Sequence, residues 1–217
     1  MEYTQLIRIA FTSLWVSGTS VTIAALVGLP LAFIIAGNRF IGKKALITVL
    51  NTLMSLPTVV VGLLVYSFLC KKGLLGNLGL LYTPYAMIIG QFILASPIIT
   101  ALTISAIEGA DERIEKTALT LGATRFQALL TLGAEMRIAI LAAVVAGFGR
   151  VFAEIGVSMM LGGNIKNYTR NITTAIAFET AKGEFSLGIA LGIILLLSAL
   201  LINLLFQLLA RRRSEAI

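Results

Sequence analysis

Two groups of charged residues interrupt long apolar runs in this sequence, and their residue types limit the chemistry the chain can do. In the first group, Arg150 and Glu154 lie four residues apart, which lets them pair on one helix face. The second group includes Glu115 and Arg125. There is no histidine, and Cys70 is the single cysteine, so the sequence excludes a His/Cys metal site. It also contains no G-x-x-x-x-G-K-S/T phosphate loop and no nucleophile–base arrangement, so we expect no enzyme, metal or cofactor on this chain.

The composition places these charged groups in a membrane protein. The 217 residues are 58% hydrophobic and 12% charged, whereas a soluble domain has roughly 25% charged residues. The net charge of +7 comes from basic residues beside apolar runs, which indicates membrane topology rather than nucleic-acid binding. Because a spanning helix needs about 20 apolar residues, we predict an all-α membrane protein with about five transmembrane helices, at residues 11–36, 45–69, 84–107, 138–161 and 187–210.

Basic residues are distributed unevenly between the predicted loops. With the N-terminus outside, ten of the 17 lysines and arginines lie on the cytoplasmic side, the tail 211–213 included, and six lie outside. Because cytoplasmic loops carry the excess of lysine and arginine, we predict an N-out, C-in topology for a single transmembrane domain at residues 1–217. The loop 108–137 is then cytoplasmic and the loop 162–186 is external, with a short surface helix at 172–182.

Small residues recur four positions apart on three of the predicted spans. Such pairs let helices approach each other closely in lipid. We favour packing inside one helix bundle over a subunit interface for these pairs, which are Gly18 and Thr22, Ala143 and Gly147, and Gly188 and Gly192.

The cytoplasmic loop contains the signals for two short helices. Asp111 is suited to cap the first helix, and Gly122 stands where a helix ends in a left-handed residue. Thr124 followed by Gln127 forms a capping box for a second helix. Two interpretations of this segment are equally compatible with its residues. It is either an amphipathic connector that lies on the bilayer or on its own bundle, or a docking element. The docking element would present four side chains to a partner: Glu115, Lys116, Arg125 and Phe126.

This segment resembles the cytoplasmic coupling loop of permease subunits in ABC importers, whose pattern is Glu-Ala-Ala, three residues, Gly, nine residues and Ile-x-Leu-Pro. With Gly122 at the fixed glycine, Lys116, Thr117 and Ala118 stand at the three leading positions, and Glu135 replaces the proline. The resemblance marks nine residues for coupling to an ATPase: Asp111, Glu115, Lys116, Ala118, Gly122, Ala123, Thr124, Arg125 and Phe126.

Three further stretches resemble the permeases of molybdate, tungstate and sulfate importers. They are ASPIITALTISAIEGADERIEKTALTLGA at 95–123, GFGRVFAEIGVSMMLGGNI at 147–165 and NIKNYTRNITTAIAFETAKGEF at 164–185, of which the last is most similar to tungstate permeases. The resemblance implies the type I importer (MetI-like) fold in a bacterial or archaeal cytoplasmic membrane. It also implies the partners: a second copy of the chain, two cytoplasmic ATPase subunits that hold ATP and Mg, membrane lipid, and an extracytoplasmic binding protein that delivers an oxyanion, tungstate or molybdate.

The resemblance leaves several residue roles open. Arg150 and Glu154 form either a structural ion pair or part of a translocation gate, and the helix rise places them in the outer half of their span. Pro57 and Pro97 are further pathway candidates, because proline interrupts a helix. The external loop is either solvated or contacts the binding protein, and its candidate contacts are Lys166, Arg170 and Lys182.

Two alternative functions are compatible with the sequence. The first is an autonomous secondary carrier or channel, which needs ion-coordinating groups inside the membrane, where only Arg150 and Glu154 provide charge. The second is a membrane scaffold, which would tolerate disruption at Gly122 without any loss of solute uptake.

Overall fold

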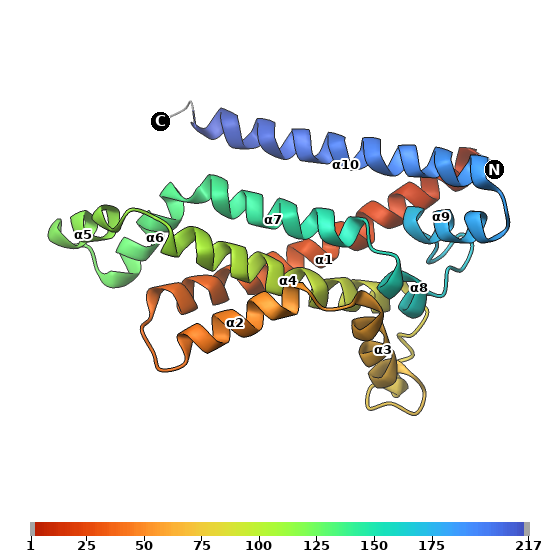
Figure 1. The fold of residues 1–217 in the computed structure, drawn as a ribbon, viewed down its shortest axis with the longest axis horizontal. Helices are drawn as coiled ribbons and strands as arrows, with labels where there is room; N and C mark the ends of the chain where they lie inside the picture. The colour runs from red at the N-terminus through yellow and green to blue at the C-terminus, as the bar shows by residue number, and fades with distance from the viewer. Residues whose placement is uncertain (1–2, 215–217) are drawn as a thin grey trace.

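The computed structural model describes residues 3–214, except for the side chains of Tyr3, Glu112, Gln207 and residues 209–214. The side chains of Arg211, Arg212 and Arg213, which contribute to the topology prediction, therefore lie outside the described part. Within it, the chain forms only helices (Figure 1): α1 (Tyr3–Gly37), α2 (Lys43–Met54), α3 (Thr58–Leu69), η1 (Gly76–Leu78), α4 (Pro84–Glu108), α5 (Glu112–Thr120), α6 (Arg125–Glu135), α7 (Arg137–Phe152), α8 (Gly156–Gly162), α9 (Ile172–Ala181) and α10 (Phe185–Ser214).

The number of helices that can cross a membrane agrees with the prediction of an all-α membrane protein with about five spans. Three segments are long and apolar enough, at Thr4–Gly37, Pro84–Glu108 and Phe185–Phe206. Two bent helix pairs, α2 with α3 and α6 with α7, raise the number to five if each pair counts as one span. The N-terminus lies at one end of the molecule beside α9, and the C-terminus lies at the other end with α5 and α6 (Figure 1). This separation of the two termini is the arrangement that the N-out, C-in topology requires.

Helix α4 forms the centre of the bundle. It contacts α1, α7, α8, α2 and α3, and 72% of its most apolar stretch is buried, against 6% for α10. Its sequence is apolar on all sides, which is the pattern of a helix enclosed by others. Small residues on the surrounding helices allow this close contact: a Cβ on Gly28 of α1 would lie 2.8 Å from Thr100 Oγ1, and one on Gly147 of α7 would lie 2.7 Å from Ile99 Cγ1.

The small-residue pairs are expected to pack inside the bundle, and two of their glycines do so. Gly147 packs against α4, and a Cβ on Gly188 would lie 2.8 Å from Thr180 Oγ1 of α9. At Gly18 and Gly192, however, an added Cβ meets nothing within 4 Å. The expectation is therefore wrong at those two positions.

Two of the predicted spans are broken. The span at 45–69 bends by 97° between α2 and α3, because Pro57 has no amide proton to continue α2 and instead stands at the N-cap of α3 with φ −61° and ψ 123°. The span at 138–161 is also wrong as one helix, since α7 ends at Phe152 and α8 begins at Gly156. Pro97, in contrast, lies buried within the uninterrupted α4.

The expected surface helix at 172–182 is present as α9, but its exposed residues all lie in its second half, and its first half is buried. Ile172, Thr173, Thr174 and Ala175 are each at most 2% exposed, because α9 packs against α10 and α1. The loop 162–186 is thus partly a structural layer of the bundle.

The contact between α4 and α8 predicts which glycine is sensitive to a larger side chain. A Cβ on Gly90 would overlap Val157 Cγ1 and would lie 2.6 Å from Leu161 Cδ1, both on fully buried side chains. We expect Gly90→Val to destabilise the purified protein by about 1–3 kcal/mol, measured as a lower melting temperature in detergent, because overpacking forces the neighbours apart. Gly192→Val is the matched control, since a Cβ there meets nothing. Equal melting temperatures for the two variants would contradict the packing of α8 on α4.

Candidate functional site

The segment predicted to be cytoplasmic forms the two capped helices that its sequence predicts. Asp111 Oδ1 accepts a hydrogen bond from Arg113 N at 2.8 Å and thereby caps α5. Gly122 follows α5 with φ +90°, a left-handed conformation that favours glycine. Thr124 N donates to Gln127 Oε1 at 2.8 Å, and Gln127 N donates to Thr124 Oγ1 at 3.3 Å, which completes the capping box at the start of α6. The predicted helix break with a left-handed glycine at Gly122 is confirmed, and we call residues 111–135 the two-helix segment.

The two-helix segment exposes an apolar surface with charged residues around it. Leu121 is 82% exposed and Phe126 is 70% exposed. Ala118 and Ala123 are half-buried, whereas the other marked residues are exposed: Asp111, Glu115, Lys116, Gly122, Thr124 and Arg125. An exposed apolar patch rimmed by polar groups is typical of a surface that contacts another protein.

Helix α6 fixes this surface to the bundle. A Cβ on Gly37 would lie 2.8 Å from Leu129 Cδ2, and the Phe33 ring covers Gly133. Both contacts are with the C-terminal end of α1. A bend of 69° then joins α6 to α7, although Glu135 stands where the coupling-loop pattern has proline. Displacement of the two-helix segment would therefore act directly on α1 and α7.

Arg150 and Glu154 form the predicted ion pair, but not on a continuous helix. Arg150 Nη1 lies 2.8 Å from Glu154 Oε2, and Glu154 stands in the break between α7 and α8. Its other oxygen, Oε1, accepts from Val157 N at 3.3 Å, while its main-chain oxygen accepts from Thr173 Oγ1 at 2.9 Å. The Glu154 side chain is only 4% exposed, against 38% for Arg150. Glu154 thus holds the break together as well as pairing with Arg150.

The two helix breaks lie against each other. A Cβ on Gly156, the first residue of α8, would lie 3.0 Å from Thr58 Oγ1 and 3.2 Å from Glu154 Oε1. Thr58 is the first residue of α3 and directly follows the exposed Pro57. The structure therefore brings Pro57 and the Arg150–Glu154 pair into one region, while the buried Pro97 belongs to the packed centre of α4.

A buried polar contact that the sequence reasoning missed joins α4 to α8. Gln91 Nε2 donates to Ser158 Oγ at 3.2 Å, and both residues are fully buried. Gln91 Oε1 is also buried and accepts no hydrogen bond within the described part of the chain. The signal was available, because Gln91 is a polar residue in the middle of an apolar span, where polar groups are costly and associated with function.

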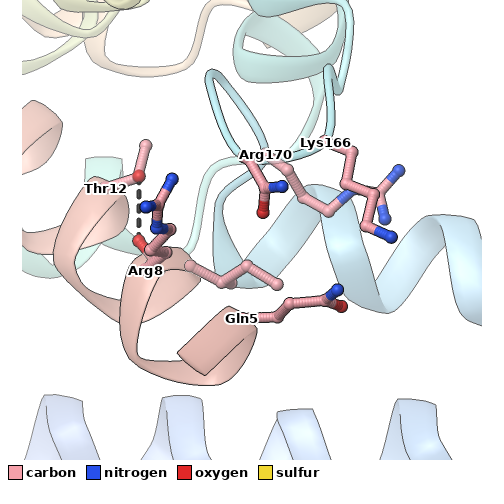
Figure 2. A pocket seen from close by; sticks show the side chains of 7 residues that line it. Gln5, Arg8, Thr12, Lys166 and Arg170 are labelled. Carbon is pink, nitrogen blue, oxygen red and sulfur yellow. Dashed lines mark hydrogen bonds between the residues drawn. The ribbon is translucent and has the colours of Figure 1, made fainter. Parts of the chain in front are cut away.

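The loop 162–186, predicted to be external, does not gather its three predicted contact residues into one group. Arg170 and Lys182 lie on the Phe178 ring, with their charged ends 4.5 Å and 5.0 Å from its centroid. Lys182 also pairs with Glu179 at 2.9 Å. Lys166 instead lines a pocket together with Arg170 and Arg8 of α1 (Figure 2).

Comparison with known proteins relates this architecture to transport proteins. Residues 28–215 match the family described as "Binding-protein-dependent transport system inner membrane component". The tungstate uptake system permease protein TupB of Peptoclostridium acidaminophilum is 41% identical over 199 residues, which are 92% of this chain and 87% of that protein. A probable anion ABC transporter permease protein of Haloferax volcanii is 38% identical over 208 residues, 94% of this chain and 90% of that protein. In fold, the chain matches a bacterial ABC transporter involved in the import of the acidic polysaccharide alginate, with a TM-score of 0.75 at 22% identity over 97% of this chain and 80% of that one.

The geometry at the break predicts how the ion pair contributes to stability. We expect Arg150→Met to destabilise the protein by about 1–3 kcal/mol, because it leaves the buried Glu154 carboxylate without its cation. Adding Glu154→Gln should recover most of this loss, since the neutral amide oxygen can still accept from Val157 N. Melting temperatures of the two single variants and the double variant measure this coupling. A double variant no more stable than Arg150→Met would show that the charge of Glu154 is not what the pair neutralises.

Proposed function

Because the chain belongs to the binding-protein-dependent transport system inner membrane component family, we propose that it is the permease of an ATP-driven importer whose cargo is tungstate. Its family and relatives make it a transporter subunit of the ABC importer class that serves oxyanions, rather than an enzyme. The similarity to a tungstate permease over nearly the whole chain is the observation that carries the proposal. Molybdate is the second candidate cargo.

The two-helix segment is the surface proposed to dock on the ATPase. Exposed Leu121 and Phe126 offer an apolar contact, and exposed Glu115, Lys116 and Arg125 surround it with charge. ATP and Mg would be held by the partner, because this sequence contains no phosphate loop. Two ATPase subunits, one for each of two permease copies, would be required.

The meeting of the two helix breaks is the proposed place of the translocation pathway. Transporters build their substrate routes where discontinuous helices face each other, because unwound backbone is tolerated only against protein or a water-filled cavity. Here Arg150 carries the cation that favours an anion, and Glu154 neutralises it. Glu154 is not proposed as a ligand, since both its carboxylate oxygens already accept bonds within the chain.

The opposite end of the molecule is proposed to face the extracytoplasmic binding protein. Lys166, Arg170 and Lys182 all lie on the external loop, and basic residues would be complementary to acidic ones on the binding protein. The exposed apolar faces, above all that of α10, are proposed to meet lipid or the second copy of the chain in the cytoplasmic membrane. An autonomous carrier would instead import tungstate without any ATPase, and a scaffold would not import it at all.

Two glycines at opposite ends of the molecule test the docking proposal. Gly122 and Gly183 have φ values of +90° and +84°, meet nothing within 4 Å of an added Cβ, and each donate its amide proton to the carbonyl three residues earlier at 3.0 Å. We expect Gly122→Pro to abolish copurification of the ATPase and ATP-dependent tungstate uptake, because proline removes the donor and the left-handed backbone. Gly183→Pro should retain the ATPase, as it makes the same change away from the two-helix segment. Loss of the ATPase in both variants, or in neither, would contradict docking at Gly122.

The exposed aromatic side chain of the two-helix segment gives a second test. Phe126→Ala should weaken ATPase binding at least about tenfold without lowering the melting temperature, because exposed aromatic residues that become buried dominate interfaces. Tyr168→Ala is the control, since Tyr168 is 49% exposed on the external loop. Affinity of the detergent-solubilised permease for the immobilised ATPase measures the difference. Equal affinities for the two variants would remove Phe126 from the interface.

A further inference from the structure

A small pocket at the external end of the molecule is lined almost entirely by polar side chains. It lies between the first turns of α1 and the segment 166–170, and its lining residues are Gln5, Arg8, Ile9, Thr12, Lys166, Asn167 and Arg170 (Figure 2). Three of the seven are cations and only one is apolar. Arg8 comes from α1, some 160 residues before Lys166 and Arg170 in the sequence, so the fold brings this charge together.

The three cations have no carboxylate partner among the residues that the structure describes. No carboxylate of the described residues lies within 4.0 Å of Arg8, Lys166 or Arg170. The other basic residue of this loop, Lys182, differs because it is paired with Glu179. Like charges that gather around one space without an acid between them repel each other, and an anion that binds there relieves the repulsion.

The segment that carries Lys166 and Arg170 is held in place. Arg170 Nε donates to Asn164 Oδ1 at 3.1 Å, and the guanidinium stacks on Phe178. The buried Thr169 hydroxyl donates to Gly162 O and accepts from Ile165 N, which closes the turn between them.

A separate contact fixes this segment relative to α1. Ile172 N donates to Ser13 Oγ at 2.8 Å, with both residues buried. The backbone that carries Arg8 is therefore held relative to the segment of Arg170 before any ligand arrives, which lowers the entropic cost of binding.

We propose that Arg8, Lys166 and Arg170 form an oxyanion-collecting site at the external end of the permease. The inference rests on the proposed function for its orientation and its cargo. The ligand is a doubly charged tetrahedral oxyanion such as tungstate, whose oxygens accept charge-assisted hydrogen bonds from guanidinium and ammonium groups. The enclosed part of the pocket is only about 10 Å³, so the anion rests at its mouth between the exposed Arg8 and Lys166 side chains. Binding there is weak and reversible, which suits a site of transit between the binding protein and the pathway.

The test compares two charge-matched variants of the full chain. The site variant is Arg8→Gln with Lys166→Gln, and the control is Lys71→Gln with Lys72→Gln, a second exposed basic pair in a loop on the predicted external side. Each pair of substitutions removes two positive charges. Neither the Arg8 nor the Lys166 side chain makes a hydrogen bond or ion pair with the described part of the chain, so their replacement should not affect folding. The melting temperature of each purified protein is titrated with sodium tungstate at ionic strength held constant with sodium chloride, because a ligand of the native state raises it in a saturable way.

We expect tungstate to raise the melting temperature of the wild type and of the Lys71/Lys72 variant alike. The Arg8/Lys166 variant should need at least about tenfold more tungstate for the same rise, since two charge-assisted contacts are lost. Equal titrations for all three proteins would overturn the site. An equally weakened response in the Lys71/Lys72 variant would also overturn it, because the response to tungstate would then reflect only the general surface charge.

Two further measurements separate this site from the proposals on which it rests. If the wild-type importer drives no ATP-dependent tungstate uptake, the proposed cargo fails, and titration with sodium sulfate and sodium molybdate then tests the site alone. If the Arg8/Lys166 variant still responds to tungstate but no longer captures the binding protein, the cluster is a protein-docking surface and the oxyanion site is refuted.

Discussion

A helix that breaks inside an apolar bundle has to satisfy the backbone groups it frees, and in this protein Glu154 does so. Its carboxylate accepts from Arg150 and from Val157 N, while its main-chain oxygen accepts from Thr173. Without water in the hydrocarbon region, each of these groups would otherwise cost several kcal/mol. The helices on either side of the break are joined through this residue. It orients α8, which packs on α4 at Gly90, and it connects α8 to α9 through Thr173.

Helix α1 connects the two ends of the molecule. At 1.5 Å per residue its 35 residues extend about 52 Å, so that Arg8 at the pocket and Gly37 beside α6 are separated by about 44 Å along the helix. It contacts the two-helix segment through Phe33 and Gly37, and Ser13 accepts the amide proton of Ile172 near the other end. The proposed docking surface and the loop 162–186 thus both pack on the same uninterrupted helix. Pro30 within α1 does not break it, so a displacement imposed at one end has a continuous element along which to act.

The sequence predicts what local interactions determine, and fails where distant residues decide. Asp111, Gly122, Thr124 and Gln127 act on their own few neighbours, so both short helices and their hinge could be predicted with their boundaries. The break after Phe152 could not, because apolar residues continue on both sides of Glu154 and the partner Thr173 lies 19 residues further on. The burial of α9 depends on α10 and α1 in the same way. The external pocket escaped notice for the same reason, since nothing in the sequence relates Arg8 to Lys166.

Charge is arranged differently at the pocket and at the helix breaks, and the difference follows from the surroundings. Arg8 and Lys166 are exposed and have no carboxylate near them among the described residues. Water screens such cations, so that they attract an anion without holding it long. At the break, the Arg150 side chain is only 38% exposed, so the same charge would act through a lower dielectric and bind a dianion more strongly. An anion trapped there could not move on, and conduction requires binding weak enough to allow departure. Glu154 removes that obstacle by neutralising Arg150 in place. The carboxylate that stabilises the break is therefore also the group that keeps the proposed pathway from becoming a binding site.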